Sequence, residues 1–70
     1  MKIVLSSHAK KRLFERNVNI KYVQDTIAMP DYTISRNNKK EAYKKISNKI
    51  LKVVYIEEDN YIKVITLIWK

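Results

Sequence analysis

The sequence contains no cysteine and no glycine, and only one proline and one histidine among its 70 residues. Without cysteine, neither a disulfide nor a thiolate metal site can form, and a single histidine leaves too few ligands for a zinc site. No run of about 18 apolar residues is present, so the sequence predicts no transmembrane helix. We therefore expect a cytoplasmic protein that binds no membrane, no metal and no cofactor.

Acidic residues are also scarce. Seven Asp and Glu stand against fifteen Lys and Arg, which gives a formal net charge of +8. A field of this sign attracts polyanions and speeds encounters with them. The charge favours nucleic acid or another acidic partner, whereas the alternative is a small structural protein whose lysines reflect an AT-rich genome.

Seventy residues are enough for one small domain, residues 1–70, with a single core. The pattern before Pro30 predicts two helices. The first begins at Ser6 or Ser7, which can cap it, and ends near Asn17, a residue that tolerates the left-handed conformation. The second begins after Asn19 and stops before Pro30, because a proline pushes the preceding residue out of the α region.

Strand patterns make up the rest of the sequence. They cover residues 2–5, 31–36, 41–47, 48–57 and 61–70, the first as a short edge strand and the last two as an antiparallel hairpin. We expect an α+β fold in which two N-terminal helices pack on one face of an antiparallel sheet of about four strands. The register of the last hairpin stays open, because a slip of one residue exchanges the two faces.

The only histidine opens a basic stripe on the first predicted helix. His8, Arg12 and Arg16 recur at intervals of four residues, so they lie along one side of a helix. An imidazole can accept or release a proton near neutral pH, and an arginine fork matches phosphate oxygens. The stripe is a candidate catalytic phosphate site, and the alternative is an ordinary basic helix whose arginines cover apolar surface.

The strands add candidate substrate-binding residues, namely Tyr43, Lys45, Lys52, Tyr55 and Thr66. Lys52 stands between apolar neighbours and has to reach solvent or a polar groove, because an unpaired charge is costly to bury. Aromatic rings beside cations on a sheet let bases stack while phosphates pair with the cations. The same lysines would equally protect an exposed sheet from aggregation.

Three sequence motifs together span nearly the whole chain. They are Ser-x-His-Ala-x-x-Arg-Leu-x-x-Arg-Asn-Val, then Ile-Ala-Met-Pro-Asp, then the strand pair with Lys-Val-Val-Tyr and Ile-Lys-Val-Ile-Thr-Leu-Ile-Trp. The pattern resembles a family of small bacterial and archaeal proteins grouped with the RelE/ParE-like toxins, including the BrnT type. These belong to the barnase–EndoU–colicin–RelE class of metal-independent ribonucleases. Family members often carry Gly-Ile where this chain has Asn17 and Val18, and Asn can adopt the same left-handed cap.

The resemblance implies helices on a curved antiparallel sheet, a site that cleaves RNA or contacts the ribosome, and a cognate antitoxin that wraps the basic surface. Carried over by position, it assigns to the site His8, Arg12, Arg16 and Thr66. The general chemistry of the class adds Tyr43, Lys52 and Tyr55 as weaker candidates.

We therefore expect the toxin of a toxin–antitoxin system that cleaves mRNA or ribosome-bound RNA without a metal. In this hypothesis the RNA 2′-hydroxyl attacks its own phosphate while His8 serves as general base or acid. Arg12 and Arg16 stabilise the charge that develops on the phosphoryl oxygens. The alternative is a non-catalytic RNA- or ribosome-binding module, or a toxin-like inhibitor of a protein target.

Overall fold

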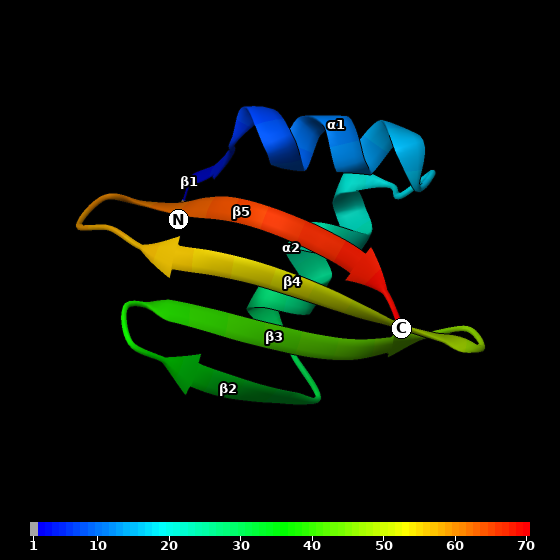
Figure 1. Ribbon diagram of the computed structural model, residues 1–70. Helices are drawn as coiled ribbons and strands as arrows, with labels where there is room; N and C mark the ends of the chain where they lie inside the picture. Colours follow the sequence, from blue (N-terminus) through cyan, green and yellow to red (C-terminus); the bar gives the residue numbers. More distant parts are fainter. Residues whose placement is uncertain (1) are drawn as a thin grey trace.

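The computed structural model describes residues 2–70 as one sheet with two helices (Figure 1). The strands form a single sheet in the order β1-β5-β4-β3-β2. Two helices and a five-stranded sheet make the chain an α+β protein, as predicted. The elements are β1 (Lys2–Leu5), α1 (Ser7–Glu15), α2 (Ile20–Ala28), β2 (Tyr32–Arg36), β3 (Lys39–Ile46), β4 (Lys49–Glu57) and β5 (Tyr61–Trp69).

The sheet has five strands rather than about four, and it is mixed rather than antiparallel. The strands from β2 to β5 pair antiparallel in sequence order, β2 with β3, β3 with β4 and β4 with β5. β1, by contrast, runs parallel to β5, with Lys2 opposite Tyr61 and Leu5 opposite Val64. No hairpin fixes the direction of β1; α1 begins directly after it and continues along the same edge of β5 (Figure 1).

Ser6 begins α1 and ties it to β5. Its side-chain oxygen accepts a hydrogen bond from the Ala9 N–H (3.0 Å), which confirms an N-cap here. Its hydroxyl also donates to the Ile65 carbonyl (3.0 Å). Ile65 is the extra residue at a bulge, because Val54 pairs with Thr66 and Tyr55 with Val64.

α2 begins and ends where the sequence predicts. The Asn19 side chain accepts a hydrogen bond from the Lys21 N–H (2.8 Å) and caps the helix. α2 ends at Ala28, two residues before Pro30. Between the helices, Asn17 takes a left-handed conformation (φ 52°), which also confirms its predicted role at the end of the first helical segment.

Two hairpin turns need a positive φ, and the chain has no glycine to supply it. Asn37 (φ 56°) follows β2 and Ser47 (φ 57°) follows β3. Asparagine adopts this conformation readily, whereas serine lacks that preference. The turn at Ser47 therefore forms at a conformational cost that glycine would avoid.

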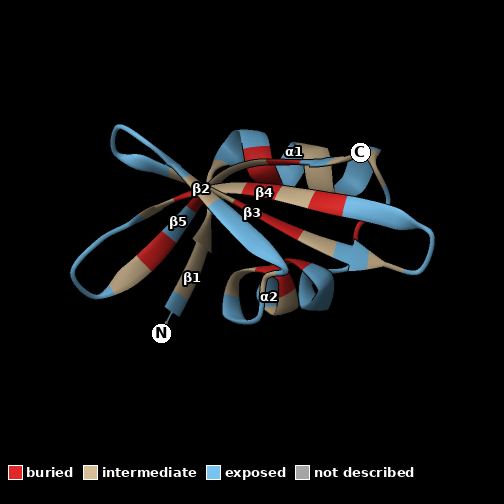
Figure 2. Ribbon diagram, turned by 90° about the horizontal axis from the view of Figure 1, so that it is seen from below, coloured by how far each residue is buried: buried red, intermediate tan, exposed pale blue. Residues whose placement is uncertain are grey.

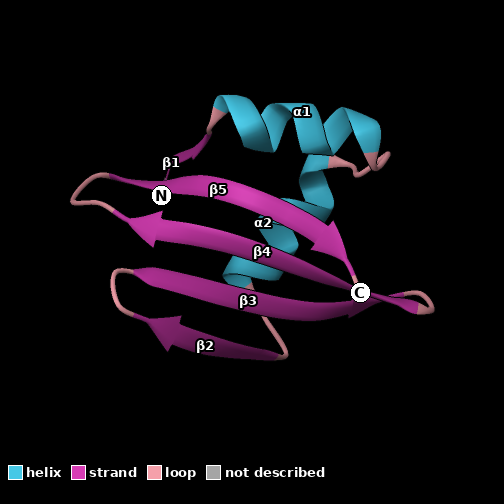
Figure 3. Cartoon of the chain, viewed as in Figure 1, coloured by secondary structure: helices cyan, strands magenta, loops and turns pink. Residues whose placement is uncertain are grey.

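One core lies between the sheet and the helices. α2 packs against β3 and β4 and lies behind the strands in Figure 1, whereas α1 lies along the outer edge of β5. Buried and half-buried positions alternate along β4 (Figure 2), so Leu51 and Val53 point toward the helices. Val64 and Leu67 of β5 are equally buried. The two helices of the described residues leave the opposite face of the sheet uncovered (Figure 3).

Candidate functional site

The uncovered side of the sheet, here called the open face, carries alternate residues of β2, β3, β4 and β5. The strand register arranges them in three rows that run across the strands. The first two rows are Tyr32, Tyr43, Lys52 and Ile68, and Ile34, Glu41, Val54 and Thr66; the third consists of two pairs, Arg36 with Lys39 and Ile56 with Lys63. Directly opposite side chains in such a sheet have Cβ atoms about 4.5–5.5 Å apart. These rows hold one carboxylate among several Lys and Arg, so the open face is basic.

Two tyrosines stack in the first row. The ring centroids of Tyr32 and Tyr43 are 4.6 Å apart, and the rings are nearly parallel, at 10°. Lys52 Nζ lies 5.8 Å from the centroid of the Tyr43 ring. Tyr43 is only 8% exposed because Tyr32 and Lys52 flank it, whereas Tyr32 remains 52% exposed. The stack thus has an accessible ring, Tyr32, at one end and a cation, Lys52, at the other.

Glu41 connects the charged residues of the open face. Its Oε1 accepts a hydrogen bond from the Tyr43 hydroxyl (3.1 Å) and lies 3.9 Å from Lys52 Nζ. Its Oε2 lies 3.5 Å from Arg36 Nε. Burial, and then the contact with the Glu41 carboxylate, raises the pKa of the Tyr43 phenol above its ordinary value. The phenol therefore stays protonated and keeps donating to Glu41.

A hollow in the surface adjoins this network at the turn between β2 and β3. Its walls include Arg36 and Lys39 at the strand ends, together with Glu41 and Ile56 from the open face. Asn37 and Asn38 of the turn complete it. An acidic group that enters the hollow meets two cations and can approach the Glu41 network from solvent.

On α1, the predicted basic stripe begins with an exposed imidazole. Arg12 Nε donates a hydrogen bond to His8 Nε2 (3.3 Å), and Arg12 Nη1 contacts Glu15 Oε1 (2.9 Å). These contacts follow from helical spacings of four and three residues. His8 is exposed and Arg12 is half-buried. The structure thus brings His8 and Arg12 together as one accessible pair.

Arg16, the third residue of the stripe, makes different contacts. Its Nη1 donates to the Leu67 carbonyl of β5 (3.3 Å), and its own carbonyl accepts a hydrogen bond from the Trp69 indole N–H (3.1 Å). β1 covers only residues 61–64 of β5, so the carbonyls beyond them need other donors. The Arg16 guanidinium therefore bonds to the edge of β5, whereas Arg12 bonds to His8.

Two strands separate the α1 pair from the tyrosine stack. β5 and β4 lie between α1 and β3, and neighbouring strands are about 4.8 Å apart, so the separation is roughly 10 Å or more. Thr66, half-buried on β5 opposite Val54, lies between the two groups on the open face. The two groups are therefore too far apart for one small ligand to contact both.

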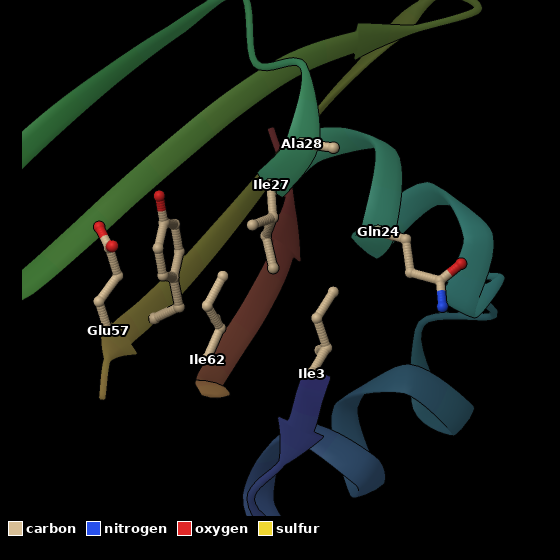
Figure 4. Close-up of a pocket in the computed structure, with 7 residues that line it drawn as sticks. Ile3, Gln24, Ile27, Ala28, Glu57 and Ile62 are labelled. Carbon is tan, nitrogen blue, oxygen red and sulfur yellow. The ribbon is translucent and has the colours of Figure 1, made fainter. Parts of the chain in front are cut away.

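Tyr55 does not lie on the open face, which corrects its assignment to a substrate-binding surface. It is 6% exposed and points to the helix-covered side, where it lines a pocket with Ile27, Ile62 and Ile3 (Figure 4). Burial raises the pKa of its phenol. The sequence left the hairpin register open, and in the structure the odd-numbered residues of β4 from Leu51 point inward.

The remaining predicted residue, Lys45, is exposed beyond the tyrosine row, opposite Ile50 of β4. Sequence reasoning missed Tyr32, Arg36 and Glu41. For Glu41 a pattern was available, because a residue two positions before Tyr43 in a strand shares its face. For Tyr32 and Arg36 no local pattern exists, since their place depends on how β2 pairs with β3.

Within residues 2–70, no helix is long and apolar enough to cross a membrane. No curated protein and no solved structure matches the chain. One family model does match, that of a domain of unknown function, DUF4258, and it covers residues 5–69. The match extends from the end of β1 to the end of β5, and so includes both α1 and the open face. The chain therefore belongs to the DUF4258 family.

Proposed function

We propose that the protein binds single-stranded RNA on its open face, as the toxin of a toxin–antitoxin pair. The observation that carries this proposal is the Tyr32–Tyr43 stack beside Lys52, on an uncovered sheet in a chain of net charge +8. Every base has a π-face that can stack on an exposed tyrosine, while lysine and arginine pair with the phosphates. A single strand suits this surface better than a duplex, because bases are free to stack only when they are unpaired.

The toxin role rests on the resemblance of the sequence to the RelE/ParE-like toxins. The arrangement of two helices before the antiparallel strands β2 to β5 supports a RelE/ParE-like fold, with β1 as an added parallel edge. A cognate antitoxin that presents acidic side chains to the open face would compete with RNA for the same cations.

Binding of a labelled single-stranded oligouridylate, followed by fluorescence anisotropy, tests the proposal. Tyr32→Ala should weaken binding by about 1–3 kcal/mol, the usual cost of losing one base–aromatic stack. Phe14→Ala is the matched control, because Phe14 is an aromatic residue 83% exposed on α1 and does not belong to the strands of the open face. The proposal fails if wild-type protein does not bind the oligonucleotide at low salt, or if both variants lose affinity equally.

A second candidate function, metal-independent RNA cleavage, is favoured by the exposed His8–Arg12 pair. In this reaction the 2′-oxygen forms a bond to phosphorus and gives up its proton. The bond from phosphorus to the 5′-oxygen breaks, and that oxygen receives a proton. The products are a cyclic phosphate and a 5′-hydroxyl. His8 would exchange one of these protons, and Arg12 would stabilise the phosphoryl oxygens.

Incubation of RNA with the protein and a chelator separates the two functions. If His8 is catalytic, His8→Ala should slow cleavage about 10²–10⁴-fold and leave oligouridylate affinity unchanged. Equal cleavage by both proteins contradicts a catalytic His8. RNA binding without cleavage by either protein favours the non-catalytic module, and toxicity without RNA binding would point to a protein target.

A further inference from the structure

We infer that Arg36 and Lys52 form a phosphate subsite of the open face, and that the Glu41 carboxylate occupies this subsite in the free protein. The inference rests on the proposed RNA binding and adds a competitor that belongs to the chain itself. An RNA phosphate can reach both cations only when it displaces Glu41 from them.

The geometry of Glu41 is that of a stand-in for a phosphodiester. One carboxylate oxygen faces Arg36 Nε at 3.5 Å, and the other faces Lys52 Nζ at 3.9 Å. A phosphodiester likewise presents two charged oxygens that two cations can share. Both distances exceed the 2.7–2.9 Å or so typical of a tight charged hydrogen bond. Glu41 therefore attracts both cations but forms a tight charged hydrogen bond with neither.

The surroundings of Glu41 allow a phosphate to replace its carboxylate beside the two cations. The Arg36 side chain is 68% exposed and borders the hollow, so it can turn toward an entering phosphate. The Tyr43 hydroxyl donates to Glu41 and does not depend on either cation. When Arg36 and Lys52 turn to a phosphate, Glu41 thus keeps the Tyr43 hydroxyl as a hydrogen-bond partner. The Glu41 side chain is only 14% exposed and need not move into solvent.

The subsite also lies within reach of the tyrosine stack. Lys52 is in the same row as Tyr32 and Tyr43, whereas Arg36 lies four residues along β2 from Tyr32. Four strand residues span about 13 Å. A base stacked on Tyr32 lies two strands, or about 10 Å, from Lys52. The backbone of the same RNA strand can therefore run from the stack to the phosphate subsite that Lys52 and Arg36 share.

The test compares two substitutions that remove the same charge from opposite faces of the sheet. Glu41→Gln keeps a carbonyl acceptor for Tyr43 but frees Arg36 and Lys52. Glu57→Gln frees Lys40 of β3, the ion-pair partner of Glu57 on the helix-covered side of the sheet. We expect Glu41→Gln to bind the single-stranded oligouridylate about tenfold more tightly. Glu57→Gln should gain less than about twofold near physiological salt, because distant charges are screened.

A variant that retains the negative charge at position 41 separates the effect of net charge from the effect of the contacts with the two cations. The shorter side chain of Glu41→Asp cannot span both cations, so it should also bind RNA more tightly than the wild type, by about threefold. Adding Arg36→Gln to Glu41→Gln should cancel most of the gain, because the gain depends on that cation. Thermal unfolding of each variant establishes that it is folded.

The inference is overturned if Glu41→Gln and Glu57→Gln gain equally, since net charge alone would then explain both. It is also overturned if Glu41→Gln and Glu41→Asp both weaken binding, because Glu41 would then organise the surface for RNA. If the wild type and both glutamine variants, all folded, fail to bind RNA at low salt, the proposed function itself fails.

Discussion

Two clusters of the same residue types lie on opposite faces of β3 and β4. Each consists of a tyrosine and a lysine that pair across the two strands, with a glutamate close to the lysine. They are Tyr55, Lys40 and Glu57 on the helix-covered face, and Tyr43, Lys52 and Glu41 on the open face.

The two tyrosines are almost equally inaccessible, at 6% exposure for Tyr55 and 8% for Tyr43. The groups that cover the two tyrosines differ, however. Tyr55 lies under α2 and borders the core, whereas Tyr43 is flanked by the side chains of Tyr32 and Lys52. An exposed side chain changes rotamer within nanoseconds, but a packed helix moves only at a large cost. Low exposure therefore marks a core residue on one face and, on the other, a residue that is covered only by neighbouring side chains.

The largest expected difference between the faces is in stability. Leu67 is fully buried toward the helices, and its neighbour Ile68 is 37% exposed on the open face. Leu67→Ala should lower the free energy of unfolding by about 2–5 kcal/mol, because it leaves a cavity in the core. Ile68→Ala should lower it by less than about 1 kcal/mol. Urea denaturation measures both, and equal losses would show that the open face is also packed against something.

A smaller difference is expected in RNA binding. Lys52→Gln removes a cation from the open face, and Lys40→Gln removes one from the other side of the sheet. Loss of one phosphate contact lowers the slope of log affinity against log salt by about 0.7 for a single strand. We expect this change for Lys52→Gln alone, measured by anisotropy over a salt series. The same change for Lys40→Gln would mean that RNA does not distinguish the faces.

The smallest expected effect is at alkaline pH, and the two faces share it. Burial raises the pKa of both Tyr43 and Tyr55 in the folded protein. Such a phenol contributes its full stabilisation below its unfolded pKa of about 10, and the contribution is lost as pH rises through the folded pKa. Wild-type stability should therefore fall more steeply above about pH 10 than that of the Tyr43→Phe, Tyr55→Phe double variant. Parallel curves from urea denaturation at several pH values would contradict this.

Local chemistry explains which parts of the fold the sequence predicts. Ser6 and Asn19 cap their helices because short polar side chains satisfy free N–H groups, and Pro30 limits α2 through its own ring. Period-two patterns likewise mark strands without knowledge of their partners. The parallel pairing of β1 does not follow from its own residues. Four residues can predict an extended strand, but not whether that strand runs parallel or antiparallel to its partner.

The candidate site was less predictable because it depends on pairing between strands. The bulge at Ile65 and the open hairpin register decide which face Tyr55 occupies, and neither follows from alternation alone. Helical spacing predicted the His8–Arg12 pair correctly, but it could not show that Arg16 would find a strand carbonyl instead. The contacts of Glu41 with Arg36 and Lys52 depend on strand pairing, which the local sequence does not specify.

The contacts between α1 and β5 have a consequence for how the protein is made. Ser6 bonds to Ile65 and Arg16 to Leu67, across 59 and 51 residues of sequence. Contacts this distant form slowly, because the intervening loop must first close. During synthesis, β1 and α1 therefore wait without a docking surface until β5 has left the ribosome. Through that interval α1, with its exposed His8, lacks the strand edge against which it packs in the folded protein.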